Sequence, residues 1–214
     1  MFLKNMSINA LVLGAFALTG TIILAYTNMI TKPIIETVER EYFLRSLNIL
    51  IPPDQRDNDI FNDVIYVTKP ELLGSYKPVA VYRARLKGKP VAVIINSIAP
   101  NGYNGKIQLL IAIYNNGDLA GVRVTKHIET PGLGDGIDVR KSNWILNFTG
   151  KSLANTTKQQ WAVKKDGGLF DEFTGATITP RAVVKSVQNT LLYFKDNRDS
   201  LFAIEDEKLK ASSD

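Results

Sequence analysis

The chain of 214 residues contains no cysteine and a single histidine, His127. Without cysteine it has no disulfide bond, thiolate zinc site, iron–sulfur cluster, thiol nucleophile or lipid-modified N-terminal cysteine. One histidine cannot form a histidine-rich metal site, and no second histidine is present for a Ser-His-Asp triad. We therefore predict no metal site and no catalytic residues of the chain's own. Redox chemistry would need an organic cofactor or a metal bound mainly by oxygen.

A basic patch typical of nucleic-acid binding is also missing. Basic residues number 26 and acidic residues 21, which gives a formal net charge of +5. Nucleic-acid binders usually cluster their basic residues, with aromatic residues between them, and no such cluster occurs here. The hydrophobic share of 45% and the charged share of 22% are ordinary for a globular protein. These values exclude a wholly disordered chain, and nucleic acid is not expected as a partner.

The longest uncharged segment lies near the N-terminus, between Lys4 and Lys32. Within it, Ile8–Ile30 is almost entirely apolar, and roughly 20 such residues span a bilayer core as a helix. A cleaved signal peptide would have a shorter apolar core of about 7–15 residues and a small-x-small cleavage site, which does not follow here. A buried helix of a soluble protein rarely stays uncharged for so long. We predict one uncleaved transmembrane helix over residues 8–30, after a short N-terminus of residues 1–7.

Residues 31–78 are expected to form a membrane-proximal helix and a loop. Pro33 suits a first helical turn, so a second helix is predicted to begin there, after a break at Lys32-Pro33. The polar stretch Pro52–Asp59, which contains two prolines, reads as a loop.

The pattern then changes to alternation with a period of two, which is typical of strands. A domain over residues 79–194 is expected, followed by a charged, fraying tail at 195–214. Hairpins and separate helices within it predict an α+β fold. The expected strands are Val79–Leu86, Val91–Asn96, Ile107–Tyr114 and Leu119–Thr125, and the expected helices are Asp138–Thr149 and one from Pro180 to Phe194.

Two loops carry candidate binding residues. The first, Lys126–Asp135, follows a strand and contains Pro131 and two glycines, which let backbone amides approach a ligand. An ordinary structural turn would use the same residues. The second, Asp171–Pro180, leads into the last helix, for which Thr179 is a suitable N-cap and Pro180 a suitable first residue.

This reading puts Thr177 just outside a helix N-terminus, where free amides and the helix dipole favour a phosphate. Gly175 and Ala176 leave the approach to its hydroxyl open. On local physics alone, a capped helix without a ligand explains the loop equally well.

A family resemblance favours the ligand. The motif Asp-x-x-Thr-Gly-Ala-Thr at Asp171–Thr177 resembles the flavinylation motif of FMN-binding domains in bacterial ion-translocating redox complexes. The segments ETPGLG at Glu129–Gly134 and WAVKKDGG at Trp161–Gly168 are similar to other parts of that domain. Together with the N-terminal span, the match is most similar to the family of G subunits of the Rnf (Rsx) electron transport complex. The C subunits of sodium-translocating NADH:quinone reductases are more distant relatives.

The resemblance implies FMN joined covalently, through its phosphate, to the last threonine of the motif, Thr177. A separate flavin transferase would make this phosphoester from FAD and would recognise Asp171 and Thr174. The other residues implied to lie at the cofactor are Thr174, Gly175, Ala176, Glu129, Thr130 and Leu133. His127 is read as structural or solvent-facing rather than as a flavin contact, and Lys164-Lys165 as a solvated basic face.

The implied function is that of a membrane-anchored electron carrier without turnover of its own, in contact with the other subunits of an Rnf-type complex. It would be a single-pass protein of the bacterial inner membrane, with its soluble domain in the periplasm. This orientation agrees with a slight preference of the flanking charges for a cytoplasmic N-terminus. Two alternatives stay open: an anchored enzyme that binds a nucleotide or phosphate reversibly, and a non-catalytic assembly subunit.

Overall fold

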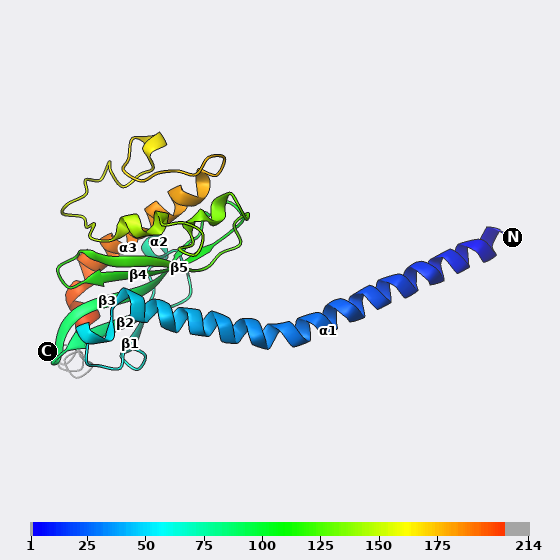
Figure 1. Cartoon of the computed structure of the whole chain (residues 1–214), viewed down its shortest axis with the longest axis horizontal. Coiled ribbons are helices and arrows are strands. Elements are labelled where there is room, and N and C mark those ends of the chain that lie inside the picture. The colour runs from blue at the N-terminus through cyan, green and yellow to red at the C-terminus, as the bar shows by residue number, and fades with distance from the viewer. Residues whose placement is uncertain (1, 204–214) are drawn as a thin grey trace. The chain divides into compact units, whose positions relative to one another are not determined.

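The computed structural model describes residues 2–203 of the chain and divides it into two units, Met1–Leu44 and Arg45–Asp214. The first unit is helical, and the second contains a five-stranded sheet with helices (Figure 1). Of the tail predicted at 195–214, residues 204–214 lie outside the described part of the chain.

The first helix, α1 (Phe2–Leu50), runs through Pro33 without interruption. The predicted break at Lys32-Pro33 is therefore wrong. A proline inside a helix removes one hydrogen bond and crowds the preceding turn, at a cost of about 3 kcal/mol. The residues around it, Met29–Val38, contain no glycine and no second proline, so no turn signal reinforces the disruption. One lost bond is not enough to end a helix of this length.

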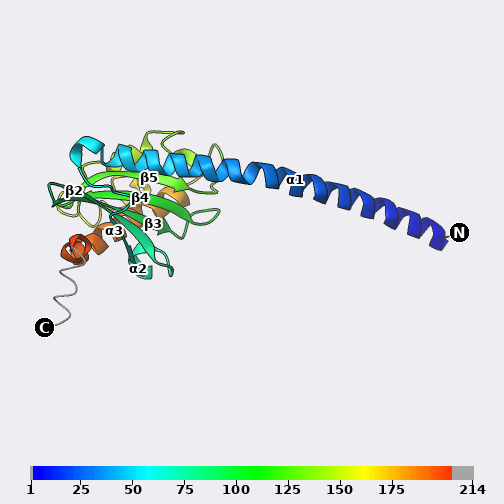
Figure 2. The same ribbon diagram turned by 90° about the horizontal axis from the view of Figure 1, so that it is seen from below.

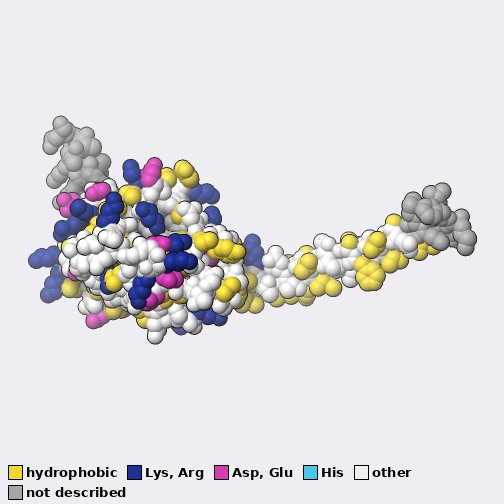
Figure 3. Space-filling view, turned by 90° about the horizontal axis from the view of Figure 1, so that it is seen from above, with side chains coloured by type: hydrophobic (Ala, Val, Ile, Leu, Met, Phe, Trp, Pro, Cys, Tyr) yellow, Lys and Arg dark blue, Asp and Glu magenta, His cyan; other side chains and the backbone are white. Residues whose placement is uncertain are grey.

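The N-terminal part of α1 presents apolar side chains to the outside. Leu11, Phe16 and Leu24 are each more than 70% exposed, and Figure 3 shows hydrophobic side chains along this helix. The hydroxyl groups of Thr19 and Thr21 donate to the carbonyl oxygens one turn earlier, at 2.8 Å. In residues 2–203, α1 is the one helix long and apolar enough to cross a membrane. These features are those of a membrane-spanning helix.

The second unit is an α+β fold, as predicted. Its sheet is antiparallel and its strands lie in sequence order. The strands are β1 (Val64–Val67), β2 (Val79–Leu86), β3 (Lys89–Ala99), β4 (Ile107–Tyr114) and β5 (Leu119–Lys126). The sequence predicted the last four, with β3 somewhat shorter, but not β1 or the short helix α2 (Pro70–Leu73), both of which fall in the expected loop region.

Both faces of the sheet are covered. The long C-terminal helix α3 (Ile178–Phe202) lies against one face, and Figure 2 shows it on one side of the strands. Four apolar residues on the side of α3 that faces the sheet are fully buried: Val183, Val184, Val187 and Leu191. On β5, a Cβ added at Gly121 would come within 2.9 Å of Leu50, the last residue of α1. The end of α1 therefore packs closely on the sheet.

The helix predicted over Asp138–Thr149 is not formed. Only a short 3₁₀ segment, Trp144–Phe148, is helical, and its residues Trp144, Ile145 and Phe148 are buried. Before it, the hydroxyl of Ser142 donates to the carbonyl oxygen of Gly136 at 2.6 Å and accepts from the amide of Trp144 at 3.1 Å. Such side-chain bonds compete with helical ones and favour turns.

Helix α3 extends beyond the predicted end at Phe194 and reaches Phe202. Leu201 and Phe202 are buried, and two arginines of β2 bond to the carbonyl oxygens at its C-terminus. Arg83 donates to Ala203 at 2.8 Å and Arg85 to Phe202 at 2.7 Å. The last turn is therefore fixed by tertiary contacts that its charged sequence does not indicate.

Candidate functional site

The start of α3 differs from the predicted one. The helix begins at Ile178 with Thr177 at the N-cap position, and the amide of Arg181 donates to the carbonyl oxygen of Thr177 at 3.3 Å. Pro180 lies within the first turn, where its missing N–H costs little. The prediction that Thr179 caps the helix is wrong. Thr179 is a fully buried residue inside the helix, and its hydroxyl bonds to the Glu129 carboxylate.

A cavity of about 210 Å³ lies at this helix start. It is lined by six of the residues that the sequence singled out: Glu129, Thr130, Leu133, Gly175, Ala176 and Thr177. Four further lining residues were not predicted as ligand contacts: Tyr103, Gly134, Ile178 and Thr179. Two loops far apart in the sequence thus meet at the N-terminus of α3.

Glu129 holds this arrangement together. Its side chain is only 4% exposed, and its carboxylate accepts hydrogen bonds from three separate donors. These are the amides of Tyr103, at 3.2 Å, and Asn104, at 3.1 Å, and the hydroxyl of Thr179. A buried carboxylate is stable only when such donors replace water. Glu129 therefore joins the β3–β4 loop, its own loop and α3.

Two glycines allow this close approach. A Cβ added at Gly134 would come within 2.8 Å of the Thr179 hydroxyl oxygen and 3.0 Å of the Glu129 carboxylate. A Cβ at Gly102 would come within 2.3 Å of the carbonyl oxygen of Gly105. Any larger residue at either position would push the loops apart.

The loop after Glu129 turns back on itself and exposes an apolar side chain. The amides of Leu133 and Gly134 both donate to the carbonyl oxygen of Thr130, at 3.1 Å. The amide of Gly132 donates to the carboxylate of Asp135 at 2.8 Å. The side chain of Leu133 is left 47% exposed on the cavity wall. An apolar surface of this kind suits an organic ligand better than water.

The motif around Thr174 forms a tight turn. Phe173 and Ala176 make an isolated antiparallel bridge, and Gly175 adopts a φ of +78°, which glycine tolerates without strain. Thr174 is exposed on this turn and does not line the cavity.

Asp171 also lies outside the cavity lining. Its exposed carboxylate pairs with the ammonium group of Lys164 at 2.5 Å, and its carbonyl oxygen accepts from the indole of Trp144 at 2.7 Å. Lys164 is itself largely exposed and belongs to the surface rather than to the cavity. In the same region the guanidinium of Arg181 forms hydrogen bonds with Asp166 that hold the pKa of this carboxyl below its ordinary value. This pair ties the 164–166 turn to the first part of α3.

His127 does not line the cavity but supports the loop that does. Its Nδ1 accepts a hydrogen bond from the amide of Glu129 at 3.1 Å, and its Nε2 lies 3.9 Å from the carboxylate of Asp138. Burial alone would raise the pKa of Asp138. The hydrogen bonds and charge of Arg140, with a smaller effect of His127, lower it below its ordinary value instead.

Metal binding receives no support within residues 2–203, where no group of three or more histidine, aspartate or glutamate side chains is placed to hold an ion. The cavity combines the partly exposed hydroxyl of Thr177, a helix N-terminus and apolar side chains on its wall. This combination suits an organic phosphate with a large apolar part.

Comparison with known proteins identifies the two parts of the chain. The FMN-binding domain family matches residues 102–192, which include every residue that lines the cavity. The family described as the RnfG N-terminal region matches residues 1–50, the extent of α1.

Whole-length relatives share one name, that of the G subunit of an ion-translocating oxidoreductase complex. The protein from Shewanella baltica is 46% identical over 203 residues, which cover 94% of this chain and 96% of the relative. The protein from Pseudomonas aeruginosa is 47% identical over 203 residues and 95% of each chain. That from Vibrio parahaemolyticus is 46% identical over 195 residues, or 91% of this chain and 92% of the relative. The chain therefore belongs to the family of G subunits of ion-translocating oxidoreductase complexes, with an FMN-binding domain behind an N-terminal membrane helix.

Proposed function

We propose that this chain is a membrane-anchored electron carrier whose FMN is joined through its phosphate to Thr177. When bound, FMN supplies the redox chemistry that a chain without cysteine and with one histidine lacks. The relatives are named as subunits of an ion-translocating oxidoreductase complex, so the other subunits of such a complex are the proposed electron donor and acceptor.

The observation that carries the proposal is the different surroundings of the three hydroxyls in the motif region. Thr177 lines the cavity, is partly exposed, and makes no side-chain capping bond. Thr179 is fully buried and bonded to Glu129, and Thr174 lies outside the cavity lining. A phosphoester needs an accessible hydroxyl beside the site of the cofactor. Of the three, Thr177 best meets this requirement.

The charge of the cavity favours a covalent link over reversible phosphate binding. The first-turn amides of α3 have no acceptor within their own helix, and the helix dipole stabilises a phosphate there by ~0.3–1 kcal/mol. However, none of the described lining residues is basic, and one, Glu129, is an acid. A phosphate held by the helix terminus alone would bind weakly, whereas a covalent bond retains it. The cavity therefore fits FMN as a tethered group and gives less support to a reversible nucleotide-binding enzyme.

The chain's own residues would position the flavin ring. Leu133 and Ile178 are each 47% exposed on the cavity wall, and a ring system attached at Thr177 would cover them. Such contact would remove apolar surface from water and keep water from that part of the ring. Thr130, Gly175 and Ala176 complete the wall next to Thr177.

The exposed turn around Thr174 supports modification by a separate enzyme. Asp171 and Thr174 both lie on the surface, where a flavin transferase could reach them without unfolding of the domain. We further propose that the domain faces the periplasm, anchored in the inner membrane by α1 alone. This orientation requires that Glu36 to Asp214 lie outside the cytoplasm.

The test is covalent flavin on the full chain, produced together with a flavin transferase. We expect a fluorescent band after denaturing electrophoresis of the wild type and no such band in Thr177→Val. Trypsin should release Asp166–Arg181, which contains all three threonines, and fragmentation should locate FMN on Thr177. FMN mapped to Thr174 or Thr179, or a fluorescent Thr177→Val variant, would refute the assignment. Flavin that the wild type loses on denaturation would favour the reversible alternative.

A further inference from the structure

We infer that Tyr103 is a flavin-contacting residue, whose ring packs against the isoalloxazine ring of the FMN held at Thr177. The inference rests on the proposed function and adds to it the residue that sets the ring's position and optical properties. It concerns the β3–β4 loop, which the sequence pattern did not connect with the cofactor.

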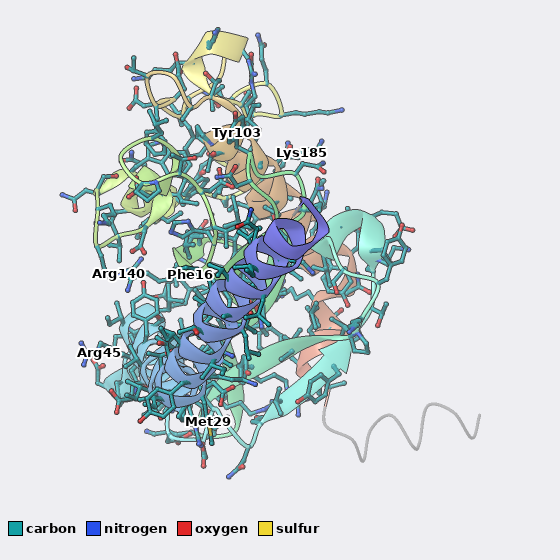
Figure 4. All side chains as sticks on the ribbon, turned by 90° about the vertical axis from the view of Figure 1, so that its right-hand side faces the viewer. Phe16, Met29, Arg45, Tyr103, Arg140 and Lys185 are labelled. Carbon is teal, nitrogen blue, oxygen red and sulfur yellow. The ribbon has the colours of Figure 1, made fainter. Side chains whose placement is uncertain are left out.

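Tyr103 lies on the wall of the cavity that contains Thr177. Its side chain is 66% exposed, yet it lines the same cavity as Thr177, and it is the one aromatic among the described lining residues. In Figure 4 it lies next to α3, the helix that carries the labelled Lys185. Aromatic side chains left open on a cavity wall are typical contacts for a flat apolar ligand, because ring stacking gives both buried area and orientation.

Hydrogen bonds fix the backbone of the β3–β4 loop that carries Tyr103. The backbone amides of Tyr103 and Asn104 both donate to the buried carboxylate of Glu129. The side-chain amide of Asn104 donates to the carbonyl oxygen of Ile128 at 3.1 Å and to the hydroxyl of Thr130 at 3.0 Å. Four hydrogen bonds thus join the β3–β4 loop to residues 128–130. The four bonds hold Tyr103 at a constant place relative to the cavity before FMN arrives.

The other large side chains on the cavity wall are aliphatic. Leu133 and Ile178 offer aliphatic contacts, but neither can stack on a ring or donate an electron to an excited flavin. The two tryptophans, Trp144 and Trp161, are buried among other aromatic rings and do not line the cavity. Quenching of the flavin by a nearby ring is therefore expected to depend on Tyr103.

The experiment measures the fluorescence yield per covalently attached flavin in the full chain, in detergent, with attachment quantified by peptide mass. Tyr103→Leu should raise the native yield several-fold while the flavin stays on Thr177, and Tyr103→Trp should keep it low. Tyr76→Leu is the matched control, because Tyr76 is 91% exposed and does not line the cavity. After denaturation all variants should fluoresce equally, which a change in attachment would not produce.

An unchanged native yield in Tyr103→Leu, with flavin attached, would overturn the inference and leave the proposed function standing. If the wild type carries no covalent FMN, both the proposed function and this inference are refuted. Should Tyr103→Leu fail to fold or to accept flavin, Tyr103→Phe gives the same test. Phenylalanine keeps the volume of the ring but is a poor electron donor, so its yield should also rise, and an unchanged yield there would count against the contact.

Discussion

The bond between Thr179 and Glu129 makes a quantitative prediction about folding. Thr179→Val removes the hydroxyl but keeps the shape of the side chain, so little cavity is created. Glu129, at 4% exposure, then keeps only its two backbone donors. Hydrogen bonds to charged groups contribute about 1.5–3 kcal/mol each, and we expect a loss of this size in the free energy of unfolding. Thr177→Val, at a partly exposed cap without a side-chain bond, should cost below about 0.5 kcal/mol.

Both variants should be compared as full-length, flavin-free protein in detergent, by urea unfolding followed through tryptophan fluorescence. Trp144 and Trp161 are both buried in the unit that contains the site, so their emission should report its unfolding. For a chain of this size the expected loss corresponds to a fall in Tm of about 2–4 °C per kcal/mol.

Two further substitutions distinguish between two roles of Thr179, as the donor of a buried hydrogen bond and as a helix cap. Thr179→Ser keeps the donor and should lose less than Thr179→Val. Asparagine is an excellent cap residue, so Thr179→Asn would be tolerated at a cap but not at a fully buried site inside the helix. Stability equal to wild type in Thr179→Asn, or equal losses in Thr177→Val and Thr179→Val, would refute the reasoning.

The remaining predictions concern the dependence of folding stability on acid pH and the side of the membrane on which the domain lies. Because the pKa of Asp138 is lowered on folding, its contribution is present above the ordinary value of 3.8 and is lost as the pH falls below it. Asp138→Asn should therefore cost about 1–2 kcal/mol in thermal unfolding at neutral pH, and the difference from wild type should shrink in acid. In a chain without native cysteine, Ser200→Cys should react with an impermeant thiol reagent in intact cells; reaction only after lysis would contradict a periplasmic domain.

The strands could be predicted because their signals are local. Strands β2, β4 and β5 are eight residues long and rich in apolar residues, and turn residues at Asn115–Asp118 separate the last two. Strand β1 has four residues and pairs only with β2, so its sequence offers too short a pattern. The end of α3 was missed for another reason: its last turn is stabilised by arginines of β2, more than 100 residues away.

The residues of the candidate site could likewise be predicted only in part from the sequence. Residues within the two motif loops were expected at the cofactor because these loops resemble those of a known family, and six of them line one cavity. The bond between Glu129 and Thr179 joins residues 50 positions apart, and no local pattern indicates it. Tyr103 had one sequence signal, an aromatic residue in a glycine-rich loop between two strands, but its relation to Thr177 depends on how the loops fold together.

The same bond bears on why we propose Thr177, rather than Thr179, as the attachment residue. Glu129 holds Thr179 inward, fully buried at the junction of three segments. Thr177, two residues earlier at the N-cap position, does not share this bond; it makes no side-chain capping bond and remains partly exposed on the cavity wall. The Glu129 carboxylate thereby occupies the hydroxyl of Thr179 and leaves that of Thr177 available for the proposed attachment.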